Sequence, residues 1–347
     1  AFFTTLLVFG TKIGARVDGA MPVLKIAIVF FVVIVGFFYV KASNFTPFIP
    51  PSQPASTVEG SSAVTGVMTQ PLWQFATGMT PSVYGVPGIL SGAALVFFAF
   101  IGFDVVATAS EETKNPHKNV PLGIGVGMLL IIVMYMLVAV VTTGMVSYAD
   151  LAKQDSPSLA TAFELVGADW AAKIISFGFV LGLASGVMVL LLGLTRIVFA
   201  MSRDGLLPRG LSKTGKHGTP AVLQIVVGTV VALVAAFFDI GVLSDMVNIG
   251  TLSAFTLVAI SIPIMRKKRP DLPRAFKMPG SPWIPILIAV ANFWLMLNLS
   301  VLTWIRFVVW LVVGFAIYFG YGYWHARLGK GDLTETLSAE TDKAVNG

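Results

Sequence analysis

Apolar residues dominate this chain in long, nearly unbroken blocks separated by short polar connections. Most blocks contain about twenty residues, the length that an α-helix needs to cross roughly 30 Å of hydrocarbon. The first stretch, residues 2–9, has the pattern of the end of an earlier span, so we expect that the sequence begins inside a hydrophobic segment. We predict eight further membrane-spanning helices, at residues 20–40, 86–110, 122–146, 171–200, 220–238, 242–265, 283–302 and 304–324.

Composition supports a membrane protein. Of the 347 residues, 56% are hydrophobic and 12% are charged, which is outside the range of ordinary soluble domains. The absence of cysteine excludes disulfides, thiol catalysis and cysteine-ligated metals. The three histidines, His117, His217 and His325, lie in separate polar segments without ligand spacing. We therefore expect neither a metal site nor a cofactor.

The net charge of +6 predicts an orientation rather than a nucleic-acid partner, because the basic residues cluster beside the ends of the spans. When successive connections are assigned to alternate sides, one side holds only Lys41, Lys153, Lys173 and Arg306, and the other holds the remaining basic residues outside the spans. The positive-inside rule makes the richer side cytoplasmic, together with the C-terminal tail. The connection at 41–85, rich in Pro, Ser, Thr and Gly, is then extracellular, either as an ordered lid or as a packed loop.

Two ionisable residues within the predicted spans need an explanation, since each costs about 2.5 to 3.5 kcal/mol near the bilayer centre. Lys25 and Asp104 both fall roughly 8 to 10 Å from the cytoplasmic boundary, at about 1.5 Å per residue. They either handle protons beside a polar cavity or have structural roles. In the structural alternative, Lys25 extends to the interface and Asp104 caps a helix segment.

A glycine adjoins this buried carboxylate. Gly102 lies two residues before Asp104 in the middle of a predicted span, where a helix break would expose backbone groups able to bind a small zwitterion. The alternative is a continuous helix with a packing glycine. In the span at 171–200, Gly178, Gly182 and Gly186 form a small-residue face for close helix packing, and Ser185 in this stretch either lines a polar site or bonds its own helix.

Signatures of an enzyme are missing from the sequence. Gly123, Gly125 and Gly127 superficially resemble a nucleotide-binding loop, but they follow no strand and begin a membrane span. The sequence also shows neither a serine elbow nor paired catalytic carboxylates. We therefore predict that the protein is not an enzyme.

Several polar motifs resemble those of the amino acid/polyamine/organocation transporter superfamily, and within it the bacterial cationic-amino-acid-transporter-like branch. The resemblance extends from residue 1 to about residue 325. The motifs are Glu111–Ile124 (EETKNPHKNVPLGI), Thr195–Pro208 (TRIVFAMSRDGLLP), Asn248–Leu252 (NIGTL), Arg269–Arg274 (RPDLPR), Pro279-Gly280 and Pro282-Trp283.

This resemblance implies an all-α polytopic membrane protein with the leucine-transporter-like fold, in which two inverted repeats of five helices precede two further helices. The predicted spans resemble family helices five to twelve, so we expect the first four helices to be missing, and with them part of the substrate site. The implied organisation is the end of the first repeat at 1–40, an extracellular loop at 41–85, a complete second repeat at 86–265, two C-terminal helices at 283–324 and a cytoplasmic tail at 325–347.

The resemblance also implies roles for individual residues. Phe98 resembles the aromatic gate above the substrate, and Ala99, Phe100 and Ile101 resemble the unwound segment whose carbonyls hold the amino group. Asp104 matches an acidic position in close relatives. Lys25 resembles the lysine that replaces the sodium ion of sodium-coupled relatives, and Ser185 falls near the helix facing it.

The implied function is proton-coupled uptake of a small neutral or cationic amino acid across the plasma membrane by alternating access. Two alternatives remain. One is an exchanger of amino acids or polyamines with the same fold, which would require a counter-substrate instead of a proton gradient. The other is a non-transporting membrane fragment or partner protein.

Overall fold

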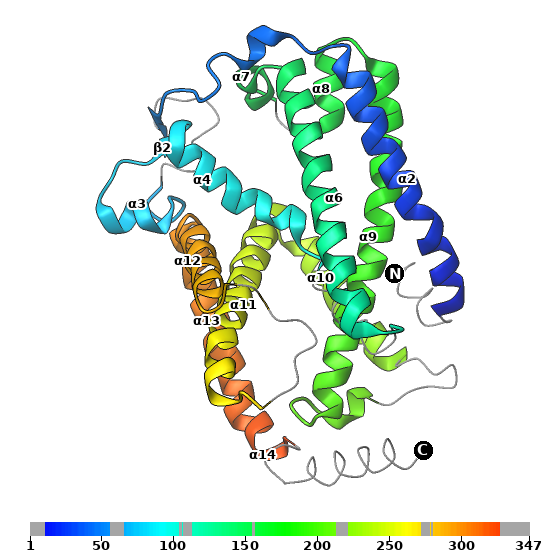
Figure 1. The fold of residues 1–347 in the computed structure, drawn as a ribbon, viewed down its shortest axis with the longest axis vertical. Coiled ribbons are helices and arrows are strands. Elements are labelled where there is room, and N and C mark those ends of the chain that lie inside the picture. Colours follow the sequence, from blue (N-terminus) through cyan, green and yellow to red (C-terminus); the bar gives the residue numbers. More distant parts are fainter. Residues whose placement is uncertain are drawn as a thin grey trace. The chain divides into compact units, whose positions relative to one another are not determined.

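The structure is a computed structural model in which residues 11–55, 66–103, 106, 113–154, 157–212, 221–271, 278 and 280–326 are described. Helical segments occupy all eight predicted spans. They are α2 (Thr11–Phe37), α4 (Gly85–Val96), α6 (Pro116–Met145), α9 (Asp169–Arg203), α10 (Ala221–Phe237), α11 (Ile240–Lys268), α12 (Trp283–Leu297) and α13 (Val301–Ile317) (Figure 1). A π-helical turn at Tyr318–Gly322 extends α13 into α14 (Tyr323–His325). The expected earlier span at residues 2–9, Asp104, His217 and the tail beyond residue 326 lie outside the described residues.

The surfaces of these helices are apolar. Among the described residues, four helical stretches are long and apolar enough to cross a membrane, and four shorter apolar helices accompany them. The four long stretches are Lys118–Met145, Asp169–Arg203, Ile240–Lys268 and Val301–His325. Only 6% of the most apolar window of α6 is buried within the protein. Exposed apolar surface on this scale is expected where lipid, rather than water, surrounds the helices.

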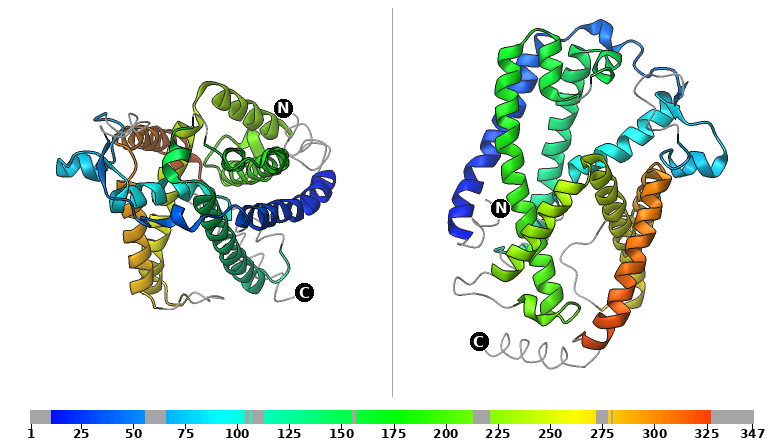
Figure 2. Two further views of the ribbon diagram at one scale, coloured as in Figure 1. Left: turned by 90° about the horizontal axis from the view of Figure 1, so that it is seen from above. Right: turned by 180° about the vertical axis from the view of Figure 1, so that it is seen from behind.

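The described contacts divide the chain into two compact units, of which the larger comprises residues 20–183 and 239–307. In this unit α2, α6, α8 (Leu159–Leu165) and the first half of α9 lie side by side (Figures 1 and 2). Phe163 and Ile175 are completely buried at the centre of their shared core, beside Val32. Gly167 at φ +78° ends α8, and the Ala168 amide then bonds the Phe163 carbonyl at 2.9 Å.

A second core of the larger unit joins α4, α11 and α12. Its buried members include Ala94, Ile249 and Leu252, together with Met296 and Leu299 at the end of α12. This core holds the last turn of α4 against the middle of α11.

The described residues of the 41–85 segment form short regular elements. It contains a two-stranded antiparallel pair, β1 (Gln53–Pro54) and β2 (Ser82–Val83), and the short helix α3 (Leu72–Thr77). Backbone hydrogen bonds attach it to the junction of α12 and α13: the Leu72 amide donates to the Leu299 carbonyl at 3.0 Å, and the Val301 amide donates to the Gln70 carbonyl at 3.1 Å. The segment is therefore fixed to the helix pair that follows it by more than two hundred residues.

The smaller unit comprises residues 1–19, 184–238 and 308–347. Within it, Met188 and Leu191 of α9 form a buried core with Leu223 and Val227 of α10. The end of α9 explains part of the Thr195–Pro208 motif. Gly205 has φ +84°, and the amides of Gly205 and Leu206 donate to the carbonyls of Ser202 and Met201 at 3.2 and 2.9 Å, which satisfies the last carbonyls of the helix.

Candidate substrate site

The predicted span at 86–110 is broken where the sequence allowed either a break or a continuous helix. Regular α-helix ends at Val96, a 3-10 turn follows at Phe97–Phe100, and Ile101 is extended at φ −67° and ψ 137°. Gly102 then has φ +119°, a backbone conformation that disfavours residues with a Cβ atom. The structure therefore selects the break, and the glycine permits the change of direction.

A buried asparagine stabilises this break. A helix that stops inside an apolar region leaves carbonyl groups without partners, which is costly unless side chains satisfy them. The Nδ2 of Asn248, a completely buried residue of α11, donates to the carbonyls of Ala94 and Leu95 at 3.2 and 3.4 Å. Asn248 begins the NIGTL motif, so the structure gives this motif residue a local role.

The unwound segment also contacts α6 and α11 through aromatic residues. The Tyr135 hydroxyl of α6 donates to the Ala99 carbonyl at 2.8 Å, and its ring lies 5.1 Å from that of Phe100 in an edge-to-face arrangement. On the α11 side, Phe103 lies 5.3 Å from Phe255. Phe98, the predicted gate, remains 43% exposed, so its ring is free to contact another group.

Lys25 lies on α2 and is partly buried. Its Cγ and Cε atoms lie 3.7 Å from the position that a Cβ atom on Gly182 would occupy, and the neighbouring Ile28 fills the space beside Gly178. Gly178 and Gly182 therefore provide the predicted close packing surface. Gly186 belongs to the smaller unit, where its Cβ position has no neighbour within 4 Å among the described residues.

Two further residues of the predicted site are Ser185 and Asp104. Ser185 is buried, at 7% exposure, and lies on α9 about one turn after Gly182. The hydrogen bonds and ring contacts of the described residues do not join Lys25 to the Phe98–Ile101 segment. Lys25 and Asp104 were predicted to lie at the same depth in the membrane. Asp104 lies outside the described residues, so this match stays a prediction.

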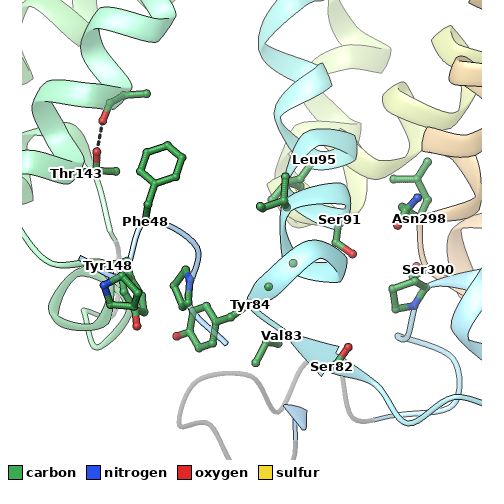
Figure 3. A pocket seen from close by; sticks show the side chains of 18 of the residues that line it. Phe48, Ser82, Val83, Tyr84, Ser91, Leu95, Thr143, Tyr148, Asn298 and Ser300 are labelled. Atoms are coloured by element: carbon green, nitrogen blue, oxygen red, sulfur yellow. Dashed lines mark hydrogen bonds between the residues drawn. The ribbon is translucent and has the colours of Figure 1, made fainter. Parts of the chain in front are cut away.

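A cavity of about 790 Å³ opens beside the N-terminal part of α4 (Figure 3). Its wall includes Leu95 near the break, but not the predicted Phe98–Ile101 segment. Thr143 and Tyr148 lie on one side of α4, and Asn298 and Ser300 lie on the other. The hydroxyl of Thr143 bonds the Ala139 carbonyl of its own helix at 2.8 Å.

The sequence analysis did not identify three residues that the structure brings to this region. Asp245 lies in the first two turns of α11 and lines the cavity. Tyr135 and Asn248 contact the broken segment, as described above. An acidic residue inside the predicted span at 242–265 was a visible signal for Asp245, and the amide of Asn248 was present in a quoted motif. No pattern along the chain indicated the Tyr135 contact, which depends on the packing of α6 against α4.

Comparison with known proteins identifies the relatives of this chain. A family model described as amino acid permease matches residues 1–322. The branched-chain amino acid permease BcaP of Bacillus subtilis is 42% identical over 328 residues, which are 94% of this chain and 63% of the relative. The methylthioribose transporter of the same organism is 38% identical over 94% of this chain and 64% of its own length. The mitochondrial cationic amino acid transporter 3 of Arabidopsis thaliana is 45% identical over 56% of this chain and 31% of its own length.

This chain thus spans less than two-thirds of the length of these relatives. The match confirms the resemblance seen in the motifs, and with it the leucine-transporter-like fold and the classification as a membrane protein of a permease family rather than an enzyme. The chain belongs to the amino acid permease family.

Proposed function

We propose that this chain transports amino acids as a proton-coupled secondary transporter of the plasma membrane, by alternating access. The observation that carries the proposal is the break at Phe97–Gly102, directly after α4, in a chain of the amino acid permease family. A break inside an apolar span places backbone carbonyls and amides where a zwitterion can bind them. Such a site needs no ionisable side chain at its centre.

The proposed substrate is a small neutral or cationic amino acid. The carbonyls of Ala99, Phe100 and Ile101 would hold its amino group, the Phe98 ring would close over it, and Asp104 would contribute a negative charge. The names of the relatives support this range, since they include a branched-chain amino acid permease and cationic amino acid transporters. The methylthioribose transporter shows that the family also contains a relative named for another solute, so methylthioribose belongs among the test compounds.

Lys25 is the proposed coupling group, with Ser185 assisting it. Lys25 packs on Gly182 and is partly buried in an apolar span, where an ammonium group carries a desolvation cost. In the proposed cycle, Lys25 couples proton entry to the change between outward-open and inward-open states.

Uptake into proteoliposomes tests the proposal. The chain is reconstituted, and the entry of radiolabelled alanine, leucine and arginine is measured with and without an inward proton gradient. We expect the gradient to stimulate uptake and a protonophore to abolish this stimulation. In the Lys25→Ala variant, uptake with the gradient should equal uptake without it, whereas Lys173→Ala, which removes an exposed lysine from α9, should behave as the unmodified chain.

Other results would select the alternatives. Uptake that ignores the gradient but requires amino acid inside the vesicles would identify an exchanger. Absence of both uptake and binding of all three amino acids and of methylthioribose, in protein that remains folded, would refute transport by this chain. It would favour the non-transporting fragment or partner protein.

A further inference from the structure

The cavity beside α4 has one charged side chain in its described wall, the carboxylate of Asp245. Lysine and arginine do not occur among these lining residues, so the charge balance of the described wall is negative. Most of the remaining wall is apolar, aromatic or hydroxylic. A single carboxylate in such surroundings attracts a monovalent cation more strongly than it would in water, because the local dielectric constant is lower.

Hydrogen bonds from α13 orient this carboxylate. The backbone amide of Thr303 donates to the Ser300 hydroxyl oxygen at 3.2 Å, and the two hydroxyl oxygens of Ser300 and Thr303 lie 2.7 Å apart. The Thr303 hydroxyl donates to Oδ2 of Asp245 at 3.2 Å, so the Ser300 hydroxyl must donate to Thr303. The two hydroxyl groups therefore form a relay in which Ser300 donates to Thr303 and Thr303 donates to the carboxylate of Asp245. Among the described residues no hydrogen bond to Oδ1 is present, and that oxygen can accept one from a ligand.

Asn298 supplies a second acceptor in the same wall. It is 5% exposed, and its Nδ2 donates to the Trp294 carbonyl at 2.8 Å. Its Oδ1 is buried and has no hydrogen-bond partner among the described residues. A buried acceptor without a partner is costly, and a donor brought by a ligand would remove this cost. Figure 3 shows Asn298 on the same side of the cavity as Ser300.

The rest of the wall is largely apolar and aromatic. Tyr84 and Tyr148 lie with ring centroids 5.2 Å apart in an edge-to-face arrangement, and Phe48 and Val83 also line the cavity (Figure 3). Divalent metal ions fit less well, because no group of three or more acidic or histidine side chains occurs among the described residues.

We propose that this cavity binds the primary ammonium group of a small organic amine or amino acid, with Asp245 and Asn298 as its acceptors. Binding at this position stands independently of transport. A role as the capture site for a transported amino acid rests on the proposed function, and would place Asp245 near the substrate before it reaches the break at Phe97–Gly102.

Arg306 of α13 is the competing positive charge. Arg306 follows Thr303 by three residues on α13, which places it on the same face of the helix as the residue that contacts Asp245, and Arg306 and Asp245 form no ion pair among the described residues. Arg306 does not line the cavity. A bound ammonium group would be repelled by Arg306 while it is attracted by Asp245, so removal of the arginine charge should tighten binding.

Calorimetric titration of the chain in lipid nanodiscs tests this site. The probe is n-butylammonium, and n-butanol and butyrate of the same length serve as neutral and anionic comparisons. We expect binding of the ammonium compound only. Asp245→Asn should weaken it about tenfold or more, as expected for loss of a charged hydrogen bond. Arg306→Gln should strengthen it, and Asp239→Asn, which neutralises an exposed carboxylate at the start of the same helix, should leave it unchanged.

The thermal unfolding midpoint shows whether each variant is folded, and Asn298→Leu provides a second, uncharged test of the same wall. Equal binding by the unmodified chain and the folded Asp245→Asn variant would overturn the proposal, as would equal binding of butylammonium and butanol. Uptake measured on the same samples separates the two proposals. A chain that binds butylammonium but carries no amino acid would retain this site and refute the proposed transport.

Discussion

At the scale of single residues, the broken span depends on polar groups supplied by other helices. Asn248 satisfies carbonyls at the end of α4, and Tyr135 satisfies the carbonyl of Ala99 inside the unwound segment. Both donors come from helices distant in sequence. The break is therefore a tertiary feature, although Gly102 makes it sterically possible.

Replacement of Asn248 by leucine tests this dependence. The substitution replaces the amide by an apolar side chain of similar size and removes the Nδ2 donor from the Ala94 and Leu95 carbonyls. We expect the free energy of unfolding to fall by about 1 to 3 kcal/mol, the cost of buried unsatisfied acceptors. Thermal unfolding in detergent measures the change.

Ser253→Ala is the matched control on α11. The Ser253 hydroxyl bonds the Gly250 carbonyl of its own helix at 2.7 Å, so its loss leaves the interhelical contact intact. A control that destabilises as strongly as Asn248→Leu would contradict a specific role for Asn248 at the break.

At the scale of helices, sequence periodicity and length predicted the spans well because lipid imposes a minimum length on each apolar segment. The predicted boundaries at 20–40, 122–146 and 171–200 each contain most of the observed helix. The Gly178 and Gly182 face was also predicted, since small residues at four-residue spacing are visible in one sequence. The part of Gly186 in that face stays a prediction, because Gly186 lies in the smaller unit, where its Cβ position has no neighbour within 4 Å among the described residues.

The interior of the predicted span at 86–110 was harder to predict. Gly102 indicated a break, but the choice between a break and a continuous helix depended on whether other helices supply donors. Asp245 was missed for a similar reason. Its position in a span was visible, whereas its hydrogen bond to Thr303 and its place in a cavity arise only when α11 packs against the start of α13.

The close contact between α2 and α9 at Gly178 can be tested by substitution. A Cβ atom on Gly178 would overlap the side chain of Ile28, so a leucine there must separate the two helices. We expect Gly178→Leu to destabilise the protein by about 1 to 3 kcal/mol through overpacking. The thermal midpoint in detergent again provides the measurement.

Gly127→Leu on α6 is the comparison, because the Cβ position of Gly127 has no neighbour within 4 Å among the described residues. It should be neutral or slightly stabilising, since leucine favours a helix more than glycine does. If the thermal midpoint falls equally in the Gly178→Leu and Gly127→Leu variants, the flexibility of glycine, and not close packing, matters at Gly178.

At the scale of the whole molecule, the sequence and the structure agree that apolar residues face outward. In the most apolar windows of the four long helical stretches, no more than 22% of the residues are buried within the protein. A soluble protein would bury most of these side chains. The chain therefore needs a lipid environment, and the basic residues at the ends of the helices predict its orientation there.

The orientation prediction can be tested directly because the chain contains no cysteine. Single cysteines are introduced at Thr80, in the ordered 41–85 segment, and at Lys267, in the basic last turn of α11, both of which are exposed. Basic residues favour the cytoplasmic side, so a membrane-impermeant maleimide should label Thr80→Cys in intact cells and Lys267→Cys only after permeabilisation. The reverse pattern would place the C-terminus outside, and labelling of both in intact cells would show mixed insertion. The reverse pattern would also place the cavity lined by Asp245, whose wall includes Thr69 and Tyr84 of the 41–85 segment, on the cytoplasmic side.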